Sequence, residues 1–216
     1  MDTTDEARAA QMEGIAFAGE TLGPLFAYDP TDAAVAPLYA ALASLDAGEA
    51  AEAWPFAGAD AVREALGAMA GALADGVGDD LTWEYRRLFC GPGAKAAPPW
   101  GSVYTDRETV VFGESTLALR RWMRERGVER LGTEAEPEDH IGTMLLLLAW
   151  LARNRPELVG EYLQDHLLTW APHFLDVMEA EAAQPFLGGL AAITRATLVG
   201  MGDELGLSVT VPRFYR

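Results

Sequence analysis

The amino-acid sequence predicts an all-α protein. Apolar residues recur at helical spacing along almost the whole chain, and the strong helix formers Ala, Leu, Glu and Arg dominate the composition. Segments in which apolar and polar residues alternate, as in half-buried strands, are hard to find. No repeat and no long polar linker divides the 216 residues. We therefore expect one globular helical domain, residues 1–216, of about eight to ten helices with one long loop rich in proline and glycine.

Residues that end helices divide the pattern into elements. Proline and glycine interrupt it at residues 29–30, 48, 54–55, 76–78, 127, 156 and 185. Between these breaks we expect helices over residues 5–27, 31–45, 58–75, 79–90, 115–126, 137–154, 157–181 and 186–205. In the fourth of these helices Tyr85, Leu88 and Phe89 share one face, because residues three and four apart are neighbours on a helix.

The charge of the chain is strongly negative and unevenly spread. The formal net charge is −17, and residues 1–80 hold 15 Asp and Glu against only Arg8 and Arg63. Such a field repels nucleic acid and anionic lipid and attracts a cationic partner. Composition therefore excludes a nucleic-acid partner. It does not by itself establish a cationic partner, because acidity that only keeps the protein soluble explains the charge equally well.

Targeting signals and disulfides are also excluded. The first residues lack a basic region before an apolar stretch, so they do not form a secretory signal. The longest apolar run, residues 141–151, is far shorter than the roughly 20 residues that cross a bilayer. The single cysteine, Cys90, allows no intramolecular disulfide and is expected to be a buried apolar side chain. We expect a cytoplasmic protein without direct membrane insertion.

One segment does not follow the helical pattern. Residues 91–104 contain three prolines and three glycines, and the loop continues to Phe112-Gly113. A loop this long inside a compact domain is usually functional. Pro98-Pro99 stiffens it, and Trp100 and Tyr104 give it a rigid aromatic surface. The alternative, that Trp100 only anchors the loop on the core, is equally supported.

A second unusual segment covers residues 136–142. Glu136, Glu138 and Asp139 stand with His140 at the start of the most apolar helix, 137–154, and Pro137 suits its first position. Ordinary helix capping accounts for part of this pattern. The additional polar groups indicate that this helix end faces a groove.

The sequence contains no recognisable catalytic or metal-binding motif. The residues three positions before the three histidines are Pro137, Leu163 and Trp170, so the Glu-x-x-His pattern of di-iron bundles is absent. A zinc-protease motif, a phosphate-binding loop and a nucleophile elbow are absent as well. Gly91-Pro92-Gly93 with the lone lysine, Lys95, is too little for a nucleotide site. We expect no enzyme activity, no cofactor and no metal.

Three motifs resemble those of a known family. The string PPWGSVYTDRETVVFGESTLALRRWMRERGV (residues 98–128) follows EYRRLFCGPG (84–93) and precedes EPEDHIG (136–142). Their order and spacing resemble the TorD/DmsD family of redox-enzyme maturation chaperones, and within it the DmsD branch. The resemblance implies an all-helical chaperone that binds the twin-arginine signal peptide, or leader, of a molybdopterin oxidoreductase of the dimethyl sulfoxide reductase type.

The resemblance also implies a binding site and further partners. The residues that match the family's leader-binding motifs are Tyr85, Leu88, Phe89, Pro98, Pro99, Trp100, Gly101, Tyr104, Pro137, Asp139 and His140, and the neighbouring carboxylates Glu136 and Glu138 join them. We expect Glu136, Glu138 and Asp139 to receive the leader's arginines, and the aromatic and apolar residues to hold its apolar part. If Asp139 only caps its helix, leader binding will not depend on it.

Several alternatives remain open from the sequence. The client is a dimethyl sulfoxide reductase type enzyme or, instead, a nitrate or formate oxidoreductase. The Tat translocase is a further expected contact. A monomer is expected, with a swapped dimer as the alternative. A nucleotide-binding hydrolase is the alternative from a different functional class.

Overall fold

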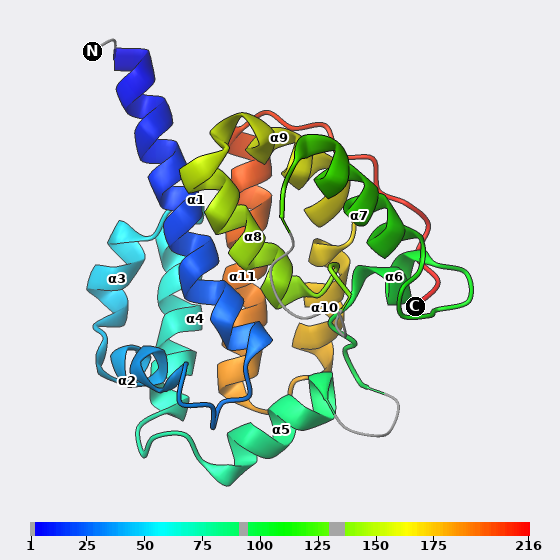
Figure 1. The fold of residues 1–216 in the computed structure, drawn as a ribbon. Helices are drawn as coiled ribbons and strands as arrows, with labels where there is room; N and C mark the ends of the chain where they lie inside the picture. The colour runs from blue at the N-terminus through cyan, green and yellow to red at the C-terminus, as the bar shows by residue number, and fades with distance from the viewer. Residues whose placement is uncertain (1–2, 91–94, 130–136) are drawn as a thin grey trace.

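The computed structural model describes residues 3–90, 95–129 and 137–216, and this part of the chain is all-α, as predicted. Figure 1 shows its helices gathered around α8 and α11. A 3-10 turn at Pro156–Leu158 precedes α9, and a π-helical turn at Leu163–Leu167 follows it. The α-helices in the described residues are α1 (Thr3–Ala27), α2 (Ala36–Ser44), α3 (Ala47–Ala53), α4 (Ala59–Ala72), α5 (Asp79–Phe89), α6 (Gly101–Thr105), α7 (Glu114–Arg126), α8 (Ile141–Asn154), α9 (Val159–Tyr162), α10 (Ala171–Glu181) and α11 (Pro185–Glu204).

Helices α1 and α8 pack closely because glycine lies at their contact. A Cβ atom on Gly19 would lie 2.5 Å from the carbonyl oxygen of Leu145, and one on Gly142 would lie 2.6 Å from the amide nitrogen of Ala27. Real side chains do not approach backbone atoms so closely, so only glycine lets these backbones touch. Since Gly142 is in the first turn of α8, this contact holds the start of α8 against the end of α1.

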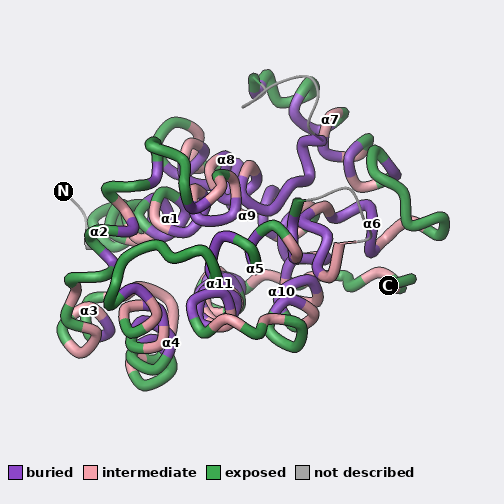
Figure 2. Tube along the Cα trace, turned by 90° about the horizontal axis from the view of Figure 1, so that it is seen from below, coloured by how far each residue is buried: buried purple, intermediate pink, exposed green. Residues whose placement is uncertain are grey.

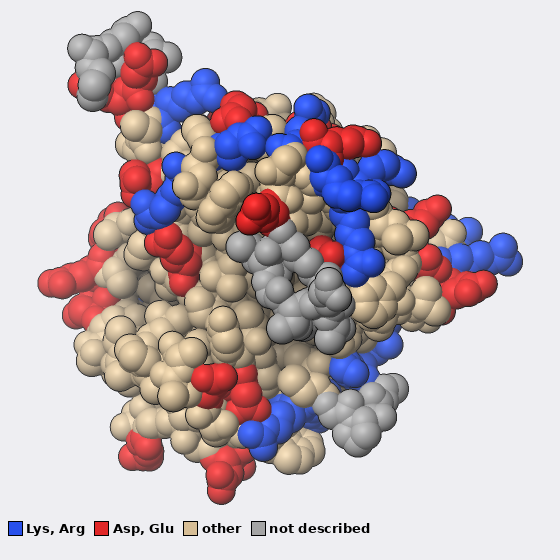
Figure 3. All heavy atoms as spheres, in the orientation of Figure 1, with Lys and Arg blue, Asp and Glu red and all other residues tan. Residues whose placement is uncertain are grey.

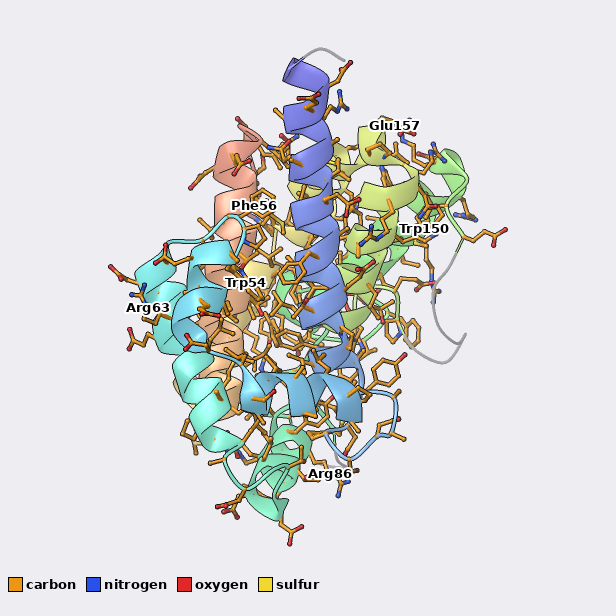
Figure 4. The ribbon with its side chains drawn as sticks, turned by 90° about the vertical axis from the view of Figure 1, so that its left-hand side faces the viewer. Trp54, Phe56, Arg63, Arg86, Trp150 and Glu157 are labelled. Atoms are coloured by element: carbon orange, nitrogen blue, oxygen red, sulfur yellow. The ribbon has the colours of Figure 1, made fainter. Side chains whose placement is uncertain are left out.

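The other half of the core forms around α11. This helix packs on α4 and on α10, and α8 carries an almost continuous apolar surface into the same core. Figure 2 shows the buried backbone concentrated in α8, α10 and α11, with exposed residues on the outer sides of α2, α3 and α4. Trp54, at the end of α3, donates its indole N–H to the Thr197 hydroxyl on α11 at 2.9 Å and so connects the outer helices to the centre (Figure 4).

Two predicted helices have different boundaries in the structure. The predicted helix 137–154 begins at Ile141, so Pro137 is not its first residue; residues 137–140 precede the helix and His140 is its N-cap. The predicted helix 157–181 is broken before α10. Pro172, in the first turn of α10, has no N–H to donate to the preceding turn, and a new helix begins there with Trp170 as its N-cap.

Smaller differences concern the chain's first half and Cys90. The predicted helix 31–45 starts only at Ala36, because Asp32 accepts the Ala34 N–H at 2.8 Å in a preceding turn. Helices α3 and α6 were not predicted, since each has fewer than two turns of pattern. Cys90 was expected to be buried but is exposed. Among the described residues, no helix combines the length and apolarity that a membrane span requires.

Candidate peptide-binding site

The structure brings the proline-rich loop and the acidic segment together. Trp100 and His140 form an isolated antiparallel β-bridge. The Gly101 N–H donates to the Asp139 carbonyl at 3.1 Å, and the Ile141 N–H donates to the Pro99 carbonyl at 2.8 Å. Two segments that lie about 40 residues apart in the sequence therefore form one unit at the entrance to α8.

Asp139 is the centre of this unit. One carboxylate oxygen, Oδ2, accepts the Ser102 N–H at 2.6 Å and the Ser115 hydroxyl at 2.7 Å. The other, Oδ1, accepts the Thr116 hydroxyl at 2.7 Å. The residue is 1% exposed, so its charge is stabilised by these donors and not by water. Both oxygens are used inside the protein, which differs from the expected role as an arginine acceptor and from simple helix capping.

Glu138 is also engaged within the chain. Its Oε2 accepts the Nε–H of Arg120 on α7 at 2.6 Å, and its side chain is only 6% exposed. Together, Glu138 and Asp139 hold α7 against the entrance to α8. Pro137 is buried, and its carbonyl accepts the His140 N–H at 3.3 Å. Glu136 lies outside the described residues.

His140 is a buried, neutral N-cap. Its Nδ1 accepts the Gly142 N–H at 3.2 Å, which places the ring proton on Nε2. Burial lowers the pKa of His140 from 6.5 to about 4, so the ring is uncharged at neutral pH. The Trp100 ring meets it edge to face, with centroids 5.9 Å apart. The ammonium group of Lys95 lies 5.3 Å from the centre of the Trp100 ring.

The predicted residues on α5 and α6 belong to the core. Tyr85 donates its hydroxyl proton to the Phe26 carbonyl at 2.7 Å and is buried with Leu88 and Phe89. Tyr104 is fully buried and stacks on Trp170, with centroids 6.2 Å apart. Burial raises the pKa of the Tyr104 hydroxyl. These buried side chains form part of the core on which the candidate site rests.

The predicted loop residues differ in burial: three are buried, and one reaches the surface. Pro98, Pro99 and Gly101 are buried, and a Cβ atom on Gly101 would lie 2.7 Å from the Trp170 ring. Trp100 is half-buried, and among the described predicted residues it alone reaches the surface. The expected groove wall is therefore a buried scaffold with one aromatic side chain at its surface.

Sequence reasoning missed the partners that hold Asp139. Ser102, Ser115 and Thr116 lie inside the family-like string, but isolated hydroxyl residues give no periodic signal. It also missed Arg120, which reads as an ordinary surface charge on an amphipathic helix. Only the fold brings these four residues to the acidic segment.

Comparison with known proteins identifies relatives along nearly the whole chain. The profile of the family described as "Nitrate reductase delta subunit" matches residues 57–176. The chain is 42% identical to a Tat proofreading chaperone DmsD from Salmonella typhi over 95% of this chain and 98% of that protein. It is 36% identical to a probable Tat proofreading chaperone DmsD from Haemophilus influenzae over the same shares of the two chains.

A relative at lower identity is also named as a chaperone. A chaperone protein TorD from Vibrio cholerae is 28% identical over 45% of this chain and 49% of its own length. These relatives are chaperones by name, which confirms the prediction of a binding protein and not an enzyme. The chain belongs to the nitrate reductase delta subunit family, which includes the TorD and DmsD maturation chaperones of redox enzymes.

Proposed function

We propose that this chain is a cytoplasmic Tat proofreading chaperone. It binds the twin-arginine leader of a molybdopterin oxidoreductase precursor, of the dimethyl sulfoxide reductase type, and holds the precursor until its cofactor is inserted and export begins. The observation that carries the proposal is the similarity to named Tat proofreading chaperones over nearly the full length of both chains. We propose further that residues 1–216 act as one domain and as a monomer, and that the chain contacts the Tat translocase.

The leader-binding site is proposed at the unit formed by the proline-rich loop and the acidic segment. The surface residue of this unit is Trp100, whose indole can cover an apolar side chain of the leader. The buried members of the predicted set hold Trp100 in position: Asp139 ties α6 and α7 to the segment, and His140 caps α8 against the indole. The unit supplies a rigid platform, which lowers the entropic cost of binding a peptide.

The acidic surface supports the choice of a cationic ligand. Figure 3 shows acidic side chains along α1 and over α3, whereas basic side chains gather over α7. A net charge of −17 raises the local concentration of a twin-arginine peptide and accelerates its association. Salt screens this attraction over about 10 Å at 0.1 M.

Calorimetric titration with synthetic leader peptides tests the proposal. Each leader is compared with a version in which Arg-Arg is replaced by Lys-Lys, at two salt concentrations. We expect binding that the replacement weakens, because lysine cannot form the bidentate bonds of arginine, and that higher salt weakens further. The absence of binding by any leader, together with robust nucleotide turnover, would refute the proposal in favour of a hydrolase. Leaders from dimethyl sulfoxide, nitrate and formate oxidoreductases, tested side by side, identify the client.

A further inference from the structure

The residues after α11 form an extended segment along the surface of the protein. Figure 1 shows this segment in red, running from α11 past α9 and α7 toward α6. Along it Val209, Pro212 and Phe214 are half-buried, whereas Ser208, Arg213 and Tyr215 are exposed. Side chains that alternate in this way are typical of an extended peptide lying on a surface. The protein therefore carries a peptide docked on its own exterior.

The last three residues of the docked peptide contact Tyr104 of the candidate site and the neighbouring His173. The Tyr215 N–H donates to the carbonyl of Tyr104 on α6 at 2.9 Å. The Phe214 ring stacks on the imidazole of His173 on α10, with centroids 4.0 Å apart and planes 5° from parallel. The His173 Nε2 lies 2.6 Å from the Arg216 carbonyl oxygen. Tyr104 and His173 are themselves in edge-to-face contact, with centroids 5.7 Å apart.

An arginine side chain of the peptide is held by the proline-rich loop. The Nη2 group of Arg216 donates to the carbonyls of Lys95 at 2.5 Å and of Ala96 at 3.3 Å. The loop is attached to α5 by the N–H groups of Ala96 and Ala97, which donate to the carbonyls of Arg87 and Leu88. The carbonyls of Lys95 and Ala96 thus lie near the C-terminal end of α5, where the helix dipole favours a cation.

The proline-rich loop offers an acceptor for an arginine side chain, whereas the carboxylates of Glu138 and Asp139 are already engaged inside the protein. Asp139 accepts three internal hydrogen bonds and Glu138 is paired with Arg120. The carbonyl pair at residues 95–96 instead accepts an arginine in the structure itself. It lies in the same loop as Trp100, and the docked segment that fills it also contacts the Tyr104 carbonyl and the His173 ring.

We propose that the Lys95 and Ala96 carbonyls, the His173 ring and the backbone of Tyr104 form the subsite for an arginine and a neighbouring apolar residue of the leader. Residues Phe214–Arg216 occupy this subsite when no leader is bound. The inference rests on the proposed function. The chemistry matches, since a twin-arginine leader combines guanidinium groups with an apolar stretch, and the docked segment presents the same two features.

The docked segment is suited to displacement. Among the described residues, its hydrogen bonds to the protein body beyond the end of α11 come from Ser208, Tyr215 and Arg216, and most of its residues are exposed, as in segments that open at low free energy. While it occupies the subsite, the apparent affinity for a leader falls in proportion to the fraction of molecules in which the subsite is open. The segment therefore acts as an internal competitor that weak peptides do not displace.

Hydrogen exchange on the full chain tests the displacement directly. The probe is a synthetic twin-arginine leader whose binding to the full chain is measured by calorimetry in parallel. We expect saturation with this leader to remove the protection of the Tyr215 amide, which loses its bond to Tyr104, while the Ala97 amide stays protected. A leader that binds and leaves Tyr215 protected overturns the inference but not the proposed function. The absence of binding by every leader overturns both.

Two variants of the full chain separate competition from charge. Arg216→Ala removes the bonds to the loop carbonyls, so the subsite opens more often and the affinity for the leader should rise by up to about tenfold. Arg213→Ala makes the same change in net charge in the same segment, where the described residues show no bond from Arg213 to the loop, and it should change the affinity by less than about twofold. Equal effects of the two variants, or weaker leader binding by Arg216→Ala, overturn the inference.

Discussion

Thr116 on α7 donates its hydroxyl proton to Asp139 at 2.7 Å, and both side chains are buried. This bond, with those from Ser102 and Ser115, joins the start of α6, the start of α7 and the segment before α8. The carboxylate of Asp139 thus connects three separate elements: α6, α7 and the segment before α8. We expect the proposed leader-binding unit to depend on this connection.

Asp139→Ala should lower the free energy of unfolding by about 3 kcal/mol, because three donors lose a charged acceptor inside the protein. Chemical denaturation measures the change. Ser115→Ala removes only one half-buried donor and serves as the control, with an expected loss of about 1 kcal/mol. If Asp139→Ala loses no more than the control does, the carboxylate is not the connecting element described above.

The buried histidine should make stability depend on pH. The folded-state pKa of His140 is about 4, below the ordinary 6.5, so between these values the unfolded chain binds more protons. Stability contributed by the neutral ring is present above pH 6.5 and is lost as pH falls toward 4, by about 3 kcal/mol in total.

Denaturation at several pH values measures this loss. In His140→Asn an amide oxygen can still cap α8 but does not titrate. The variant should show a flatter profile between pH 4 and 6.5. An unchanged profile would assign the pH dependence to other groups, such as His166, whose pKa burial also lowers.

Trp100→Ala should weaken leader binding by at least tenfold, since the indole is the surface side chain of the unit. Trp83→Ala is the matched control: Trp83 is 65% exposed on α5 and belongs to no predicted site. Titration calorimetry and thermal unfolding are measured for both variants. Similar loss of affinity in the two variants would contradict the assignment of Trp100.

Gly19→Ala should destabilise the protein by about 2 kcal/mol or more, because the added methyl group would lie 2.5 Å from the Leu145 carbonyl and push α8 away from α1. Gly67→Ala is the control, for which we expect a change in stability of the opposite sign. Gly67 is exposed inside α4 with no atom within 4 Å of the new methyl group, so this change should stabilise the protein by about 0.5–1 kcal/mol. Thermal unfolding of both variants measures the difference. A Gly19→Ala protein as stable as Gly67→Ala would show that the two helices separate easily.

Local patterns in the sequence were enough to predict much of this protein. Helical periodicity predicted the all-α class and the approximate extent of α1, α4, α5, α7 and α11, because each of these helices presents an apolar stripe to the core. The family-like motifs pointed to the proline-rich loop and the acidic segment, and the structure places these segments in contact.

The tertiary structure decided what each residue does there. Asp139, Glu138 and His140 carry the chemistry of a binding site in the sequence, yet burial and distant partners make them structural supports in this structure. The docked segment at Phe214–Arg216 has no helical pattern and no charge pattern that links it to the loop. Periodicity and motif spacing follow from neighbours along the chain. Burial and the pairing of a charge depend on residues that only folding brings together.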